Sequence, residues 1–126
     1  MNMDYKDLTV FKKAFELAML IFEESKKFPK EKMYSLTDQI RRSSRSVCSN
    51  IAEGYRKRQY PAHFSSKMSD ANMENSETQT WLLFASACLY ISTETMDNLQ
   101  KRSEEVGRLL SHMVNNPESY NPSSKK

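Results

Sequence analysis

The chain has 126 residues and a formal net charge of +3, so its length fits one domain and its charge alone does not mark a nucleic-acid binder. Two glycines and four prolines are too few for the many turns of an all-β or Rossmann-like fold. Abundant Ala, Leu, Glu, Lys and Met favour helices instead. Composition therefore predicts an all-α protein with a single core.

A first helix is predicted over about residues 8–28. Asp7 or Thr9 can cap its first amides, and Pro29 pushes Phe28 out of helical geometry. Between these ends, apolar residues recur at steps of three and four: Val10, Phe11, Ala14, Phe15, Ala18, Ile21 and Phe22. This spacing predicts one apolar stripe that faces the core.

A second helix is predicted over about residues 36–55. Ser35 and Asp38 open it in a variant of the capping box, with Asp in the usual place of Glu. Its apolar line is Leu36, Ile40, Val47 and Ile51. Gly54, near its end, is either the residue just past the helix or a point of close approach to another helix.

A long third helix is predicted over residues 61–91 and a fourth over 94–115. Pro61 suits a first helical position, and a cap near Thr93 begins the fourth helix. The third carries a coiled-coil-like seam: Phe64, Met68, Ala71, Asn75, Thr78, Leu82, Ala85 and Leu89. The short link between them requires an antiparallel hairpin. We therefore predict an up-down-up-down four-helix bundle over residues 1–115, followed by a flexible tail over 116–126.

The C-terminal half of the third helix has more apolar side chains than its seam uses. Trp81, Leu83 and Phe84 lie outside the seam. A helix that is apolar nearly all round is buried on more than one side. Either the first two helices cover this surface or the protein self-associates, and we expect self-association.

Polar residues of the third helix are interpreted as structural. Asn75, in the seam, is expected to fix the register of the helices. Glu77 and Gln79 are expected to form hydrogen bonds between helices.

The sequence lacks a recognisable catalytic or metal-binding pattern. A bundle di-iron site needs Glu-x-x-His pairs, but Tyr60 and Leu109 stand three residues before His63 and His112. No HExxH, phosphate-binding loop or GxSxG is present. We expect no enzyme activity, no cofactor and no metal.

Cys48 and Cys88 stand apart in sequence and are expected to be reduced, buried side chains. The longest largely apolar run, residues 81–91, is about half a membrane span, and the charged N-terminal region has no signal core. These features predict a soluble, cytoplasmic protein without membrane contact.

The positive charge is concentrated in one stretch. Residues 41–60 hold six basic side chains against Glu53, whereas the flanking regions are balanced or acidic. The basic residues are Arg41, Arg42, Arg45, Arg56, Lys57 and Arg58. Tyr55 and Tyr60 flank the last three and offer aromatic rings on which bases can stack. The stretch is either a nucleic-acid surface or a solvated face whose tyrosines pack on the bundle.

Several segments resemble the four-helix-bundle proteins encoded in 23S ribosomal RNA intervening sequences. The segments are Asp7-Leu-Thr-Val-Phe11, Gln39-Ile-Arg-Arg-Ser-Ser44, Ser49-Asn-Ile-Ala-Glu-Gly-Tyr55, Glu77-Thr-Gln79, Trp81-Leu-Leu-Phe-Ala85 and Cys88-Leu-Tyr-Ile-Ser92. The resemblance covers about residues 5–115.

This bacterial family implies a homopentamer. The chain is also similar to the accessory proteins of diversity-generating retroelements, which are pentameric barrels that engage a reverse transcriptase and nucleic acid. Two hypotheses follow. The oligomer binds RNA or single-stranded nucleic acid through residues 41–60, or it is an adaptor whose basic surface meets an acidic protein partner.

Overall fold

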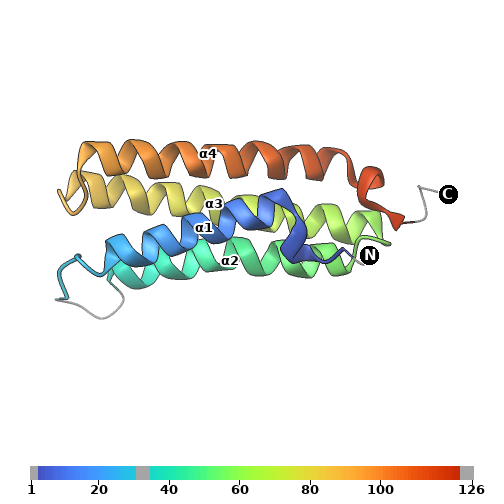
Figure 1. Ribbon diagram of the computed structural model, residues 1–126, viewed down its shortest axis with the longest axis horizontal. Helices are drawn as coiled ribbons and strands as arrows, with labels where there is room; N and C mark the ends of the chain where they lie inside the picture. Colours follow the sequence, from blue (N-terminus) through green and yellow to red (C-terminus); the bar gives the residue numbers. More distant parts are fainter. Residues whose placement is uncertain (1–2, 31–34, 123–126) are drawn as a thin grey trace.

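The computed structural model describes residues 3–30 and 35–122, and most of them lie in four α-helices. The helices are α1 (Thr9–Ser25), α2 (Leu36–Arg56), α3 (Pro61–Ala87) and α4 (Thr93–Asn115), with short 3-10 helices at Tyr5–Asp7 and Pro117–Tyr120. The four run alternately in opposite directions along one long axis (Figure 1). The described residues contain no strand. The all-α four-helix bundle predicted from the sequence is confirmed.

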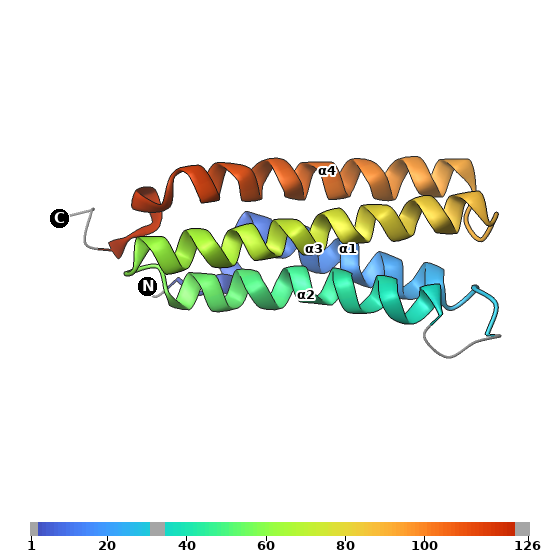
Figure 2. The same ribbon diagram turned by 180° about the vertical axis from the view of Figure 1, so that it is seen from behind.

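Each helix lies against its two neighbours around the bundle, and among the described residues no backbone contact joins a diagonal pair. Backbone contacts join α1 to α2, α2 to α3, α3 to α4, and α4 back to α1. Accordingly α1 lies in front in Figure 1, whereas α3 lies in front in the view from behind in Figure 2. The outer faces of α1 and α3 therefore point to opposite sides of the protein.

The start of α1 differs from the prediction. Asp4, rather than Asp7 or Thr9, provides the cap: its carboxylate accepts from the Tyr5 amide at 2.8 Å and initiates the first 3-10 helix. The Asp7 carboxylate reaches back to the Asp4 amide at 2.9 Å. The N-cap of α1 is Leu8, which has no side-chain cap. A polar cap was expected directly before the helix, but a capped turn precedes it instead.

The end of α1 and the start of α2 also need correction. α1 ends at Ser25 instead of residue 28, and a turn then carries Phe28 into the core, where it is buried. Ser35 is the N-cap of α2, but its side chain accepts no capping hydrogen bond, so the predicted capping box does not form. Residues 31–34 lie outside the described part of the chain.

Gly54 proves to be a point of close approach inside α2. A Cβ atom placed there would lie 2.9 Å from both Lys67 Cβ and Met68 Cε on α3. Real Cβ atoms do not come this close to such atoms, so any larger residue would push the two helices apart. Of the two alternatives for Gly54, the structure supports the close contact.

The third helix is shorter than predicted because Leu89 leaves helical geometry. Its φ is +63°, in the left-handed region, so the helix ends at Ala87 instead of residue 91. The Tyr90 amide donates to the Ala85 carbonyl at 2.9 Å, and the Leu89 amide donates to the Ser86 carbonyl at 3.0 Å. These two bonds form a Schellman ending. Leu89, predicted as part of the buried seam, is consequently exposed.

The core consists of two apolar clusters with a polar layer between them. One cluster contains Val10, Val47, Phe64 and Leu110 among others, and the second contains Ile21, Ile40, Leu82 and Leu99. Ser43, Asn75, Thr78 and Ser103 are buried polar residues, each hydrogen-bonded to another helix. Buried polar groups with complete partners specify one register of the helices.

The chain continues beyond α4 as an ordered turn. Tyr120 stacks on Phe64 with a ring-centroid distance of 5.2 Å, and partial burial raises the pKa of the Tyr120 phenol. A flexible tail was predicted from residue 116, but this contact anchors the 3-10 helix Pro117–Tyr120 to the bundle. Residues 123–126 lie outside the described part of the chain.

The two cysteines differ from each other. Cys48 is half-buried, whereas Cys88 is exposed beside the α3–α4 hairpin, which corrects the expectation of burial for both. Among the described helices, none is long and apolar enough to cross a membrane.

Candidate nucleic-acid interface

Three arginines of α2 line one shallow groove on the surface of the bundle. Its volume is about 480 Å³, and its lining comprises Asp38, Arg41, Arg42, Arg45, Ser46 and Ser49. We call this surface, defined by Arg41, Arg42 and Arg45, the arginine groove.

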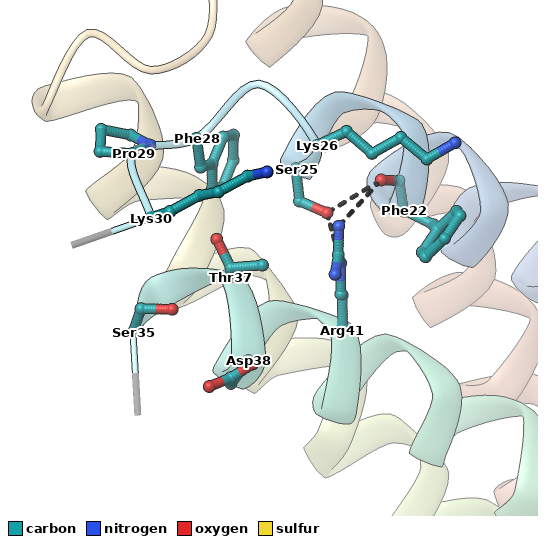
Figure 3. Close-up of a pocket in the computed structure, with 10 residues that line it drawn as sticks. All are labelled: Phe22, Ser25, Lys26, Phe28, Pro29, Lys30, Ser35, Thr37, Asp38 and Arg41. Carbon is teal, nitrogen blue, oxygen red and sulfur yellow. Dashed lines mark hydrogen bonds between the residues drawn. The ribbon is translucent and has the colours of Figure 1, made fainter. Parts of the chain in front are cut away.

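Arg41 is fixed in place by the end of α1 (Figure 3). Its Nε donates to Ser25 Oγ at 2.7 Å, and its Nη2 lies 3.5 Å from the Phe22 carbonyl. The guanidinium also lies 4.7 Å from the centroid of the Phe22 ring, a cation–π distance. Arg41 is therefore oriented by neutral groups and has no carboxylate partner among the described residues.

Arg42 and Arg45 differ in how far their charge is compensated. Arg42 forms a long 3.5 Å ion pair with Glu77 of α3, whose Oε1 also accepts from Trp81 Nε1 at 3.2 Å. Arg45 is exposed and lies 5.8 Å from the Phe22 ring centroid. It has no ion pair with any described residue. Arg45 thus has the least compensated charge in the groove.

A second basic group lies at the other end of α2. Arg56 pairs with Asp4 at 3.2 Å and lies over the Tyr5 ring. The Tyr5 amide, together with Arg56, lowers the pKa of the Asp4 carboxyl. Lys57 is exposed without a described ion-pair partner. This group is therefore partly neutralised by the N-terminal turn.

The structure does not leave Tyr55 free to stack on a base. The residue is only 6% exposed and belongs to the core cluster, and Arg58 covers its ring at 4.0 Å. The prediction of two available rings is wrong for Tyr55. Tyr60 is 51% exposed, so one ring of the predicted pair is accessible. The missed signal was the four-residue step from Ile51 to Tyr55, which continues the apolar line of α2.

The predicted basic band is divided into two groups. Arg45 and Arg56 are eleven residues apart, which is roughly 16 Å along a helix at 1.5 Å per residue. Single-stranded nucleic acid can span this length with a few nucleotides, but one phosphate cannot contact both groups. The arginine groove is the more concentrated site.

The residues of α3 that were predicted to have structural or oligomer-forming roles lie in three environments. Leu82 is 1% exposed in the core, and the Asn75 side chain exchanges two hydrogen bonds with Ser103 of α4. Gln79 donates to Ser103 Oγ at 2.9 Å. The remaining three lie outward: Trp81 is half-buried, and Leu83 and Phe84 are exposed.

Sequence reasoning missed an apolar groove between α1 and α2. The groove has a volume of about 400 Å³ and is lined by Phe15, Ala18, Met19, Phe22, Arg45 and Cys48. Phe15 was predicted to face the core, but it is exposed. Burial raises the pKa of the Cys48 thiol to about 11. We call this surface the apolar groove.

The described residues contain no group of three or more His, Cys, Asp and Glu side chains placed to hold a metal ion. A larger depression, about 690 Å³, lies beside the arginine groove and is drawn in Figure 3. Lys26 and Lys30 lie at its edge, and Lys26 pairs with Glu23 at 3.0 Å.

These features define a helical-bundle protein with a basic surface on one helix. The chain matches the model of the 23S rRNA-intervening sequence protein family over residues 6–112, and it belongs to that family. Among solved structures it is similar to a protein of unknown function from the S23 ribosomal protein family of Bacteroides thetaiotaomicron. The two are 31% identical with a TM-score of 0.76, over 84% of this chain and 98% of the other. No curated protein matches the chain.

Proposed function

We propose that this protein is a non-enzymatic, self-associating bundle that binds RNA or single-stranded nucleic acid in the cytoplasm. The arginine groove carries the proposal: three arginines and one carboxylate, Asp38, line one depression, and Arg45 has no described ion-pair partner. Phosphate oxygens accept from guanidinium groups through strong charge-assisted hydrogen bonds. The groove has no base-reading geometry of its own, so we expect affinity with little sequence preference.

Self-association multiplies the effect of a weak site. Several copies of the arginine groove on one assembly engage one strand at several points, and the joint affinity exceeds that of each contact. The resemblance noted from the sequence implies five copies. Exposed Leu83 and Phe84 on α3 support association, because burying the apolar surface that they still expose is worth roughly 25 cal/mol per Å².

The alternative function is an adaptor for an acidic protein, which could itself process nucleic acid. The pair between Arg42 and Glu77 supports it, because it shows a groove arginine already bound to a carboxylate. Burial of Tyr55 also removes one of the two rings expected to stack on bases. The two functions differ in their salt dependence, since phosphate binding releases condensed counterions.

The test is an anisotropy titration of labelled RNA with the parent protein and with the double variant Arg42→Gln, Arg45→Gln. Each lost phosphate contact should lower the slope of log affinity against log salt by roughly 0.7–0.9. The control variant is Lys101→Gln, Arg108→Gln, which removes the same charge from α4, diagonally across from α2. Arg41 is left unchanged because it holds α1 to α2.

Nucleic-acid binding requires that the groove variant bind more weakly with a flatter slope while the control matches the parent. Equal weakening of RNA binding in both variants would show that only the net charge of the protein matters. No RNA binding by the parent at low salt would overturn the proposal and favour the adaptor. Tyr60→Ala should weaken binding to single strands by about 1–3 kcal/mol for each base no longer stacked, with little change in slope.

A further inference from the structure

The outward face of α3 is an uncharged stripe that runs the length of the helix. Its residues alternate steps of four and three, and all are exposed: Ala62, Ser66, Ser69, Met73, Ser76, Thr80, Leu83 and Ala87. The solvent-facing side of a bundle helix is normally charged and polar. On this face four of the eight residues are Ser or Thr and four are Ala, Met or Leu, so it is small and uncharged and leaves room for another element to approach closely.

Large apolar side chains are exposed at two opposite corners of the bundle. Met73, Leu83 and Phe84 lie on α3, and Phe15 and Met19 lie on α1. Among the described residues, no large hydrophobic side chain of α2 or α4 is classed as exposed. Because α1 and α3 lie diagonally across the bundle, the two sets of side chains lie on helices that are not neighbours (Figures 1 and 2).

One surface is a groove and the other is the outer face of a helix. On the α1 side, Phe15, Met19 and Phe22 border the apolar groove, whose one charged lining residue is Arg45. On the α3 side, a convex helix presents small residues with Leu83 and Phe84 projecting near its end. Small residues allow close approach of a neighbouring element, while the larger ones fill a groove.

We propose that the α3 stripe of one copy packs into the apolar groove of the next copy. This inference rests on the self-association in the proposed function and specifies its surfaces. The contact joins two different faces, so it is heterologous and repeats from copy to copy until a ring closes. A second copy fits better than an unrelated partner, because one chain carries both a groove and an uncharged helix face on separate helices.

The size of one junction supports a closed assembly. The 27 residues of α3 span roughly 40 Å at 1.5 Å per residue. A contact strip about 10 Å wide then covers on the order of 400 Å² per copy, against about 800 Å² in a standard stable interface. One junction is therefore smaller than a standard interface and holds a pair together only at high protein concentration, whereas a copy within a ring has two junctions.

The junction also borders the nucleic-acid surface. Arg45 lines both the apolar groove and the arginine groove. A neighbour seated in the apolar groove therefore forms one wall beside Arg45, and the binding surface of each copy is completed by the next copy.

The test is a mixing experiment with two charge variants. Leu83→Glu damages the α3 stripe and leaves the apolar groove intact, whereas Met19→Glu damages the groove and leaves the stripe intact. Each variant alone should have the 14.7 kDa mass of the monomer in sedimentation equilibrium. Mixed in equal amounts over a concentration series that extends well above the range in which the parent assembles, the two should form one heterodimer, because a single undamaged junction remains. The control variant is Lys101→Glu, at an exposed position of α4, and its assembly should keep the mass of the parent assembly.

Two results would overturn the proposal: a monomeric parent, or a mixture that stays monomeric even at the highest concentration of the series. Parent-like association by either single variant would also reject the pairing, as expected for contacts between two copies of the same face. Circular dichroism confirms folding, and Thr80→Glu replaces Leu83→Glu if the latter unfolds. These masses do not depend on RNA, so failure of nucleic-acid binding would leave the junction standing.

Discussion

Gly54→Ala separates packing from helix propensity more directly than any other substitution in this bundle. Alanine favours an interior helix position by about 1 kcal/mol over glycine, so propensity alone predicts a more stable protein. The structure predicts the opposite, because the new Cβ would lie 2.9 Å from Lys67 Cβ. That atom is attached directly to the α3 backbone and cannot rotate away.

The magnitude follows from these two opposing effects. Ordinary contact begins near 3.4 Å, so α2 and α3 would have to separate by at least half an ångström. Overpacking of this kind costs about 1–3 kcal/mol, and subtracting the propensity gain leaves a net loss of up to about 2 kcal/mol. Urea unfolding followed by circular dichroism measures this loss as a lower midpoint.

Lys67→Gly in the Gly54→Ala background provides a check on the cause. Removing the opposing Cβ should recover part of the loss, so the double-mutant cycle should show favourable coupling between the two positions. A rise in the midpoint of Gly54→Ala would refute the close-contact interpretation. A loss of stability without coupling to Lys67 would indicate that the clash is with Met68, whose Cε lies equally close to the new Cβ.

Two further predictions concern the core layer and the cysteines. Asn75→Leu should leave the bundle folded with equal or greater urea stability. The helix register should become less uniform, because the bonds to Ser103 are lost, and amide NMR signals should broaden. Sharp signals and an unchanged oligomer would contradict this prediction. At pH 8 the exposed Cys88 should react quickly with a thiol reagent, whereas Cys48 should react slowly. The pKa of Cys48 is about 11 rather than 9.0, which lowers the thiolate fraction of Cys48 about a hundredfold. Burial favours the neutral Cys48 thiol, so the contribution of this thiol to folding stability is present below pH 9 and decreases from pH 9 to about 11. Equal labelling rates at the two cysteines would contradict the burial of Cys48.

The sequence predicted the buried seam of α3 because tertiary packing follows helical periodicity. Every seam residue from Phe64 to Ala85 is buried. The prediction failed at Leu89, where a left-handed residue ends the helix. Left-handed geometry at a leucine costs about 1–2 kcal/mol, so neither propensity nor periodicity points to it. The Schellman bonds and the packing of Ile91 in the core decide that position.

The candidate site was predictable in charge and only partly in geometry. Charge distribution along the sequence located the arginines without reference to a fold. It could not show that Arg41 is held by Ser25, because that contact depends on how α1 ends. The exposure of Phe15 was equally hidden, since periodicity gives the direction of a stripe but not the width of the surface that neighbours cover.

The arginine groove combines one fixed cation with one uncompensated cation, and this combination bears on how it would bind. Arg41 is already ordered by Ser25 and Phe22, so a bound phosphate need not pay again for its side-chain entropy. Arg45 lies over the Phe22 ring and has no described carboxylate to displace. Arg42 must first leave Glu77, although an exposed 3.5 Å pair is worth at most about 1 kcal/mol. The three side chains therefore offer a phosphate a preorganised contact, an open contact and a weakly competed one, so the groove needs little rearrangement to bind.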